Sequence, residues 1–333
     1  MSFELKEPLV WRWLPGLATI GTVAMLLAGC ETQSPPVDQL MDAPPRRDLP
    51  INFAQGHLYV PVHLFSEPQD RQFFLDSGAA GTLISDSIAR RLFPDLRRWK
   101  RVTLRGVNGT VNGFMVGRLA LGLGGRPAVF PSALTIWNWP RAMPFPRGTD
   151  GALGYDLFNR FVVRIDYRAL SLRLIAPADF EYAGSGVILP LRVGRDHMPK
   201  IELGLNFKDG THLAGEFTVD TGSDEGVFVT RGQGALPTEA ANGPDIRTRR
   251  TSTFGGMVGE RDMPLASVNL GPTVWPFAEV SVATQPDRPA ARARLSGAVG
   301  NKLLGQFKTV IFDYERNRLI LEKEEGQVVA QRR

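Results

Sequence analysis

The second half of this 333-residue chain repeats the first half, and this duplication limits the possible folds more than any other feature. Segment 73–85 reads FFLDSGAAGTLIS, and segment 217–229 reads FTVDTGSDEGVFV. Further along, GALGYDLFNRFVVRIDYRALSLRLI at 151–175 matches GAVGNKLLGQFKTVIFDYERNRLIL at 297–321. Both pairs occur in the same order, so the chain contains two copies of one structural unit.

The spacing of the two copies sets the expected domain boundaries. Asp76 and Asp220 occupy equivalent places, and the later pair of matching segments is shifted by almost the same distance along the chain. The small drift is the size of one loop insertion. We therefore expect an N-terminal lobe over 51–178 and a C-terminal lobe over 179–325, followed by a tail at 326–333.

The pattern within each copy predicts strands. Segment 57–65 (HLYVPVHLF) alternates apolar residues on one face, as a half-buried strand does, and 198–207 stands at the corresponding place in the second copy. Ser85 is placed to cap a short helix that ends before Pro94. The remaining segments read as strands and turns, so the fold class is mainly β.

The N-terminus predicts a secretory signal. Residues 13–29 are apolar, with Lys6 and Arg12 ahead of them, and Pro15-Gly16 interrupts the stretch. A membrane-spanning helix needs about 20 apolar residues. A signal peptide over 1–29 therefore fits better than an uncleaved anchor or a buried apolar helix.

Cys30 is the only cysteine, which excludes an internal disulfide framework. The preceding Leu27-Ala28-Gly29 resembles the bacterial lipobox, which directs lipid attachment to such a cysteine. Residues 30–50 would then be a lipidated, proline-rich tether to the membrane. Because Glu31 rather than Asp follows, the resemblance implies a location in the bacterial cell envelope, at the outer membrane and facing the periplasm.

The duplicated motifs resemble the retropepsin and pepsin class of aspartic proteases. Each copy has an Asp-(Ser/Thr)-Gly at the end of an apolar strand, and an apolar-apolar-Gly 78 or 80 residues later, at Gly154 and Gly300. One such tripeptide is weak evidence, but two in the same context are much stronger. The resemblance implies two similar β-barrel lobes related by a pseudo-two-fold axis, with an active-site cleft between them.

In that family, one aspartate from each lobe hydrolyses peptide bonds, which makes Asp76 and Asp220 the expected catalytic pair. Two adjacent carboxyls share one proton, so that one acts as a base on water while the other acts as an acid. No cofactor or metal is needed. The residues expected to support the site are Ser77, Gly78, Gly154, Thr221, Gly222, Ser223 and Gly300.

The two motifs differ after their glycine, where the first has Ala79 and the second has Ser223. A serine hydroxyl that donates to a carboxylate favours its charged form. We therefore expect Asp220 to carry the negative charge and Asp76 to hold the shared proton.

Other acidic residues are expected to have structural or solvated roles. Asp166 and Asp313 each end a strand beside a tyrosine, and we interpret them as structural. Asp224 and Glu225 follow the second motif and are predicted to be solvated loop charges.

Two glycine-bearing hairpins, at 105–113 and 254–260, are candidates for flaps that cover the cleft, or else are ordinary surface hairpins. Their candidate residues are Asn108, Gly109, Gly255 and Gly256. Neither hairpin has a tyrosine, unlike the pepsin flap. The aromatic and proline-rich segment 130–148 is expected to pack against its own lobe.

Composition and motifs limit the kinds of molecule that the protein is expected to bind. The net charge of +5 comes from scattered basic residues, so nucleic acid is not expected to bind. No Gly-x-Ser-x-Gly elbow or phosphate-binding glycine loop occurs. The expected partner is a peptide or protein substrate, bound by a monomer with an internal pseudo-dimer. The alternatives are a catalytically silent lipoprotein that binds a peptide between the lobes, and a dimer with two sites.

Overall fold

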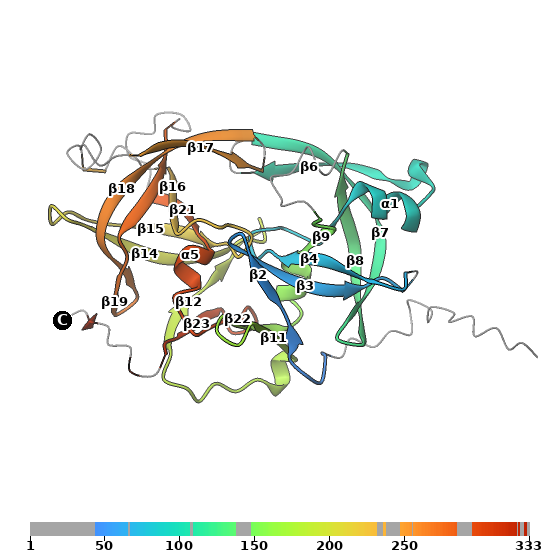
Figure 1. Ribbon diagram of the computed structural model, residues 1–333, viewed down its shortest axis with the longest axis horizontal. Helices are drawn as coiled ribbons and strands as arrows, with labels where there is room; N and C mark the ends of the chain where they lie inside the picture. Colours follow the sequence, from blue (N-terminus) through green and yellow to red (C-terminus); the bar gives the residue numbers. More distant parts are fainter. Residues whose placement is uncertain are drawn as a thin grey trace, which may run out of the picture. The chain divides into compact units, whose positions relative to one another are not determined.

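The computed structural model describes residues 44–65, 67–106, 109–137, 148–231, 236–237, 247–254, 256–284, 295–324, 326 and 330–331. This part of the chain is mainly β, which confirms the fold class expected from the sequence (Figure 1). Its strands form three sheets. The predicted signal peptide, Cys30 and most of the tether lie outside the described residues.

The first sheet belongs to the first copy of the repeat. Six of its strands follow one another in the hydrogen-bonded order β3-β4-β9-β5-β8-β7, and β7 meets β3 again at His63 and Gly122. The strands of this sheet are β2 (Asn52–Ala54), β3 (His57–His63), β4 (Asp70–Leu75), β5 (Leu83–Ile84), β6 (Lys100–Gly106), β7 (Gly109–Leu123), β8 (Arg126–Ile136) and β9 (Gly151–Leu153).

The second sheet has the same strand order. Its ring runs β14-β15-β21-β16-β20-β18 and closes by pairing of β14 with β18 to form a six-stranded barrel. The strands are β13 (Arg192–Val193), β14 (Pro199–Phe207), β15 (His212–Val219), β16 (Val227–Arg231), β17 (Thr248–Thr253), β18 (Gly256–Leu270), β19 (Thr273–Pro276), β20 (Glu279–Ala283), β21 (Leu295–Val299) and β24 (Ala330–Gln331). The repeat in the sequence is therefore a repeat of strand pairing.

A third, six-stranded sheet joins the two copies. Its order is β1-β11-β10-β22-β23-β12, and the β10–β22 pairing crosses from one copy to the other. The strands are β1 (Leu49–Pro50), β10 (Val162–Asp166), β11 (Ser171–Ile175), β12 (Val187–Pro190), β22 (Thr309–Asp313) and β23 (Arg318–Glu322).

Helices are few and short in the described residues: α1 (Asp86–Leu92), the 3-10 turns η2 (Leu96–Arg98) and η3 (Pro177–Asp179), α3 (Tyr155–Phe158) and α5 (Asn301–Leu304). The Ser85 side chain caps α1 by accepting a hydrogen bond from the Ile88 N–H, as the sequence predicts. The expectation of strands and turns elsewhere was wrong at α3 and α5. One helical turn is too short to produce a helical period in the sequence.

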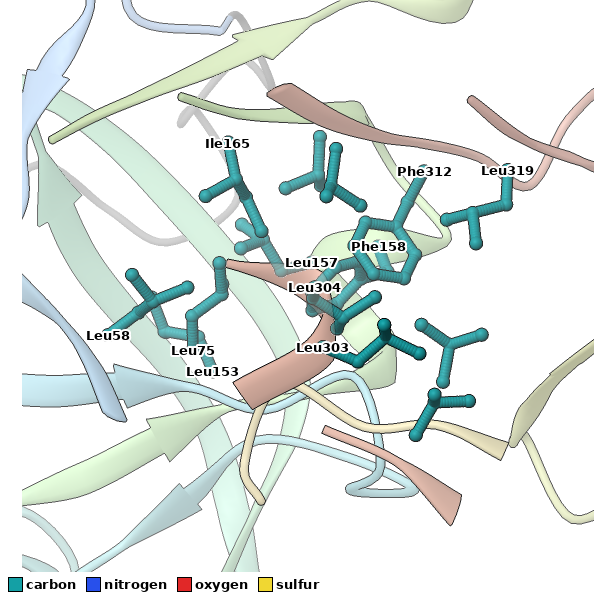
Figure 2. Packing of buried hydrophobic residues seen from close by; sticks show 14 of the residues in the cluster. Leu58, Leu75, Leu153, Leu157, Phe158, Ile165, Leu303, Leu304, Phe312 and Leu319 are labelled. Atoms are coloured by element: carbon teal, nitrogen blue, oxygen red, sulfur yellow. The ribbon is translucent and has the colours of Figure 1, made fainter. Parts of the chain in front are cut away.

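These two short helices connect the barrels to one core. Leu157 and Phe158 from α3 pack near Leu303 and Leu304 from α5, together with Phe312 of the joining sheet (Figure 2). The Phe158 and Phe312 rings meet edge to face, with centroids 5.0 Å apart. The main hydrophobic cluster contains residues of both copies, so the two barrels share a single buried interior.

Candidate active site

Asp76 and Asp220 stand at equivalent places, directly after β4 and β15. The Asp76 N–H donates to the carbonyl of Leu153 at 3.0 Å, and the Asp220 N–H donates to that of Val299 at 2.8 Å. Strand β4 pairs in parallel with β9, and β15 pairs in parallel with β21. The same local pairing therefore presents both carboxylates.

Ser77 and Thr221 link the two motifs through reciprocal hydrogen bonds. The Ser77 N–H donates to Thr221 Oγ1 and the Thr221 N–H donates to Ser77 Oγ, each at 3.0 Å. The two hydroxyls donate onward to carbonyls of the opposite copy, Ser77 to Val219 at 2.7 Å and Thr221 to Leu75 at 2.9 Å. Both side chains are fully buried. Four hydrogen bonds thus fix one aspartate loop against the other.

Gly78 and Gly222 allow the two aspartates to approach each other. A Cβ on Gly78 would lie 2.5 Å from Cγ of Asp220, and one on Gly222 would lie 2.5 Å from Cγ of Asp76. Atoms at that distance overlap, so only glycine permits this arrangement. Each carboxyl therefore lies against the glycine of the other motif.

The two carboxyls behave as one acid-base pair. Burial raises the pKa of both, and the charge of Asp220 raises the pKa of Asp76 still further. In the hydrogen bond between them, Asp76 donates, which raises its pKa and lowers that of Asp220. Backbone N–H groups favour the charged form of both carboxyls, those of Gly78 and Ala79 for Asp76 and those of Gly222 and Ser223 for Asp220. The pKa of Asp76, raised well above its ordinary value, favours the proton on Asp76 and the charge on Asp220.

The Ser223 hydroxyl does not supply this asymmetry. Its Oγ accepts a hydrogen bond from the Glu225 N–H at 3.2 Å, and it makes no hydrogen bond with Asp220. The charge on Asp220 therefore stays a prediction, and the hydroxyl donor that the sequence argument gave as its cause was wrong.

Gly154 and Gly300 lie beneath the two loops. A Cβ on Gly154 would come within 2.3 Å of the Gly81 carbonyl oxygen, and one on Gly300 within 2.5 Å of that of Glu225. Each glycine therefore packs directly against the backbone of its aspartate loop, and a residue with a side chain would not fit there.

The two candidate flaps touch. Gly109 and Gly256 begin β7 and β18 with φ of +126° and +140°, values that favour glycine. A Cβ on Gly106 would lie 2.0 Å from the carbonyl oxygen of Phe254, so the ends of the β6–β7 and β17–β18 hairpins are in contact. Asn108 and Gly255 lie outside the described residues.

Part of the aromatic segment packs on its own half, as expected. Trp137 contacts Trp99 and Phe114, with ring centroids 5.5 Å and 5.3 Å away. The Arg90 guanidinium stacks over the Trp137 ring. Trp139 and Phe145 lie outside the described residues.

Among the other acids, Glu225 departs from expectation. Its side chain is only 13% exposed and forms an ion pair with Arg249 at 2.6 Å, so it is not a solvated loop charge. The signal was hidden because the partner lies 24 residues away on β17. Asp224 is exposed, as predicted.

Asp166 and Asp313 have structural surroundings. Asp166 accepts from the N–H groups of Arg168 and Ala169, which closes the turn after β10. Asp313 is fully buried and pairs with Arg318 at 2.7 Å.

Sequence reasoning missed Asn301 and Tyr167. Both are buried, and the Tyr167 hydroxyl donates to Asn301 Oδ1 at 2.8 Å. Asn301 in turn donates to the carbonyl of Thr221. No local pattern marks either residue, because the contact spans 134 positions.

Comparisons with known proteins add nothing to this geometry. No model of a known protein family matches the chain, and no curated protein matches its sequence. In the described residues, no group of three or more His, Cys, Asp or Glu side chains is suited to holding a metal ion. No helix in the same part of the chain is long and apolar enough to cross a membrane.

Proposed function

We propose that the protein is an aspartic endopeptidase, built from two retropepsin- or pepsin-like lobes related by a pseudo-two-fold axis. Asp76 and Asp220 are its catalytic residues, and the peptide substrate binds between the lobes and beneath the two touching hairpins. The observation that carries the proposal is the reciprocal contact of the two motifs, in which each carboxyl lies against the other motif's glycine.

This reciprocal contact distinguishes a catalytic pair from two structural aspartates, because a structural aspartate does not need to contact the other motif. An Asp that only capped a turn would accept hydrogen bonds from its own loop and be indifferent to the other copy. Here two half-buried carboxyls share a hydrogen bond, although the pairing of like charges is unfavourable. Surroundings that hold two carboxyls together at such a cost are typical of catalytic sites.

The proposed reaction needs one water molecule and no covalent intermediate. The Asp220 carboxylate removes a proton from a water held between the two carboxyls, and the water oxygen attacks the peptide carbonyl carbon. Asp76 gives its proton to the carbonyl oxygen, which produces a neutral tetrahedral diol. The proton on Asp220 then passes to the amide nitrogen, the C–N bond breaks, and Asp76 recovers its proton from a diol hydroxyl.

The test is hydrolysis of a peptide library by the wild type, Asp76→Asn and Asp220→Asn, with products identified by mass spectrometry. Each variant should lose activity by at least about 1000-fold while circular dichroism stays that of the wild type. The double variant should be no worse than either single one. Asp209→Asn, at the exposed turn between β14 and β15, is the matched control.

Two outcomes would contradict the proposal. Near wild-type hydrolysis by either single variant would rule out a shared pair. A wild type that binds peptides but cleaves none between pH 3 and 8 would favour the silent binding protein instead.

Lipid attachment at Cys30 and an outer-membrane location facing the periplasm remain predictions, since residues 1–43 lie outside the described part of the chain. We include them in the proposal because the tether would hold the peptidase close to envelope proteins, the class of substrate available there.

A further inference from the structure

One buried amide holds the Asp220 loop, and the repeat does not duplicate it. Asn301, the first residue of α5, is 1% exposed. Its Nδ2 donates to the carbonyls of Thr221 and Gly56, each at 2.7 Å, and its Oδ1 accepts from the Tyr167 hydroxyl at 2.8 Å. Both amide hydrogens and the amide oxygen are therefore used.

The partners of this amide come from both halves of the molecule. Thr221 follows Asp220, whereas Gly56 lies in the turn between β2 and β3, and Tyr167 follows β10. The turn and the tyrosine belong to the first copy of the repeat. Asn301 therefore fixes the second aspartate loop to the opposite half.

The geometry connects this amide to the Asp220 carboxylate through a single peptide unit. The carbonyl of Thr221 and the N–H of Gly222 belong to the same planar group. Asn301 holds its oxygen end, and its N–H end donates to Asp220 Oδ1 at 2.9 Å. Rotation of the peptide plane would weaken both hydrogen bonds together, so the amide determines where the N–H points.

The equivalent place in the first copy lacks the amide. The residue after Gly154 is Tyr155, whose ring stacks on His197 with centroids 4.0 Å apart. The mirror of Tyr167 is Tyr314, and its buried hydroxyl has no hydrogen-bond partner among the described residues. His197 Nδ1 lies 3.2 Å from the carbonyl of Ala80, so His197 contacts this loop through a hydrogen bond and the Tyr155 stack.

We propose that Asn301 is a positioning residue of the dyad, which aims the Gly222 N–H at Asp220 and so keeps the negative charge on that carboxylate. The inference rests on the proposed peptidase function for its consequence in catalysis. The placement of charge can be measured without any substrate.

The experiment compares the wild type with Asn301→Ala, Tyr167→Phe and Tyr314→Phe. One measurement is the titration of the Asp carboxyl carbons by NMR on ¹³C-labelled protein, and the other is kcat and KM against pH on one cleaved peptide. Tyr167→Phe keeps the amide and removes only the group that orients it. Tyr314→Phe is the matched control, because it removes the hydroxyl that has no partner.

Asn301→Ala should raise the lower apparent pKa of the pair, by up to about one pH unit, since a donor to the charged form becomes misaligned. Its kcat should fall about tenfold with little change in KM, because Asn301 is buried away from substrate. Tyr167→Phe should shift both quantities in the same direction by less, and Tyr314→Phe should match the wild type.

A structural role alone predicts a lower melting temperature with an unchanged carboxyl titration, and that result for both Asn301→Ala and Tyr167→Phe would overturn the inference. If Asn301→Ala does not fold, the Tyr167→Phe titration decides alone. A wild type that cleaves nothing, combined with the expected shift in titration, would refute the peptidase and leave the positioning role intact.

Discussion

The two halves of the molecule are nearly identical at the aspartates and differ a few residues away. At the centre, the hydrogen bonds of Ser77 and Thr221 match in partners and in length. The residue types differ from Ala79 and Ser223 onwards, and five residues after each aspartate the surroundings differ as well. A Cβ on Gly81 would be 3.4 Å from the Leu134 side chain, while Glu225 hydrogen-bonds Ser281 at the corresponding place on β20.

This difference shows which contacts the pair of aspartates needs and which nearby positions are free to vary. In the proposed mechanism the two carboxyls share a proton, which requires them to lie close together, and Gly78 and Gly222 permit that approach. Gly81 and Glu225, five residues after the aspartates, lie against side chains of their own barrel. The first half has a glycine at this place, whereas the second half has a charged side chain that joins a cluster around Arg249.

The sharpest way to break this comparison is to add one carbon at the reciprocal glycines. Gly78→Ala and Gly222→Ala should each lower kcat/KM by at least about 100-fold, because a Cβ at either place overlaps the opposite aspartate. The free energy of unfolding should fall by about 1–3 kcal/mol. Peptide hydrolysis and urea unfolding measure the two effects.

Gly81→Ala is the matched control in the same loop. Its Cβ would make an ordinary contact with Leu134, and the second copy already has a side chain at the equivalent place. Equal losses for Gly81→Ala and Gly78→Ala would mean that the loop is merely intolerant of substitution and that reciprocity has no special importance.

The features that the sequence predicted are those the duplication repeats. Two apolar runs that end in Asp-(Ser/Thr)-Gly placed Asp76 and Asp220 at the ends of strands, because an apolar stretch bounded by turn residues is a local signal. The comparison of copies could also locate Gly154 and Gly300. The capped helix at Ser85 was predictable because a capping serine and a following proline are also local signals.

The features that it missed depend on contacts distant in sequence. Asn301 aligns with Tyr155, and nothing in either residue type shows that one bridges the halves while the other stacks on a histidine. Glu225 was assigned to solvent because its arginine partner belongs to another strand. Such differences between the copies depend on contacts that form only in the folded protein, so the sequence alone does not reveal them.

The charged cluster of the second half should make stability depend on pH. Burial, with Glu225 and Asp262 nearby, raises the pKa of Glu260 to about 7, although Arg249 opposes the shift. A raised pKa means that the folded state binds the proton more tightly, so stability is complete below about pH 4.5 and falls as pH rises towards 7. The loss amounts to at most about 3 kcal/mol.

Glu260→Gln should remove that part of the pH dependence. The unfolding free energy of the variant should therefore rise relative to that of the wild type between pH 4.5 and 7. Urea unfolding at a series of pH values measures it. Glu315→Gln, at an exposed position, is the control. A constant difference across the range would show that Glu260 has the same pKa in the folded and unfolded states, so that the cluster does not raise it. The first half has no counterpart of Glu225, because the equivalent residue, Gly81, has no side chain.

The smallest effect should come from the residues that differ right after the motif glycines. The Ser223 hydroxyl accepts from the Glu225 N–H, and the only group of Ser223 that favours the charge on Asp220 is its backbone N–H, which alanine retains. Ser223→Ala should therefore move the acid limb of kcat/KM against pH by less than about 0.3 units, since no donor to the carboxylate is lost. Ala79→Ser is the reciprocal variant and should be equally silent. A shift of the acid limb towards neutral pH in Ser223→Ala, by half a unit or more, would show that the hydroxyl turns to Asp220 in solution. In that case the Ser223 hydroxyl would account for part of the preference of the negative charge for Asp220, and the contribution of Asn301 to that preference would be smaller.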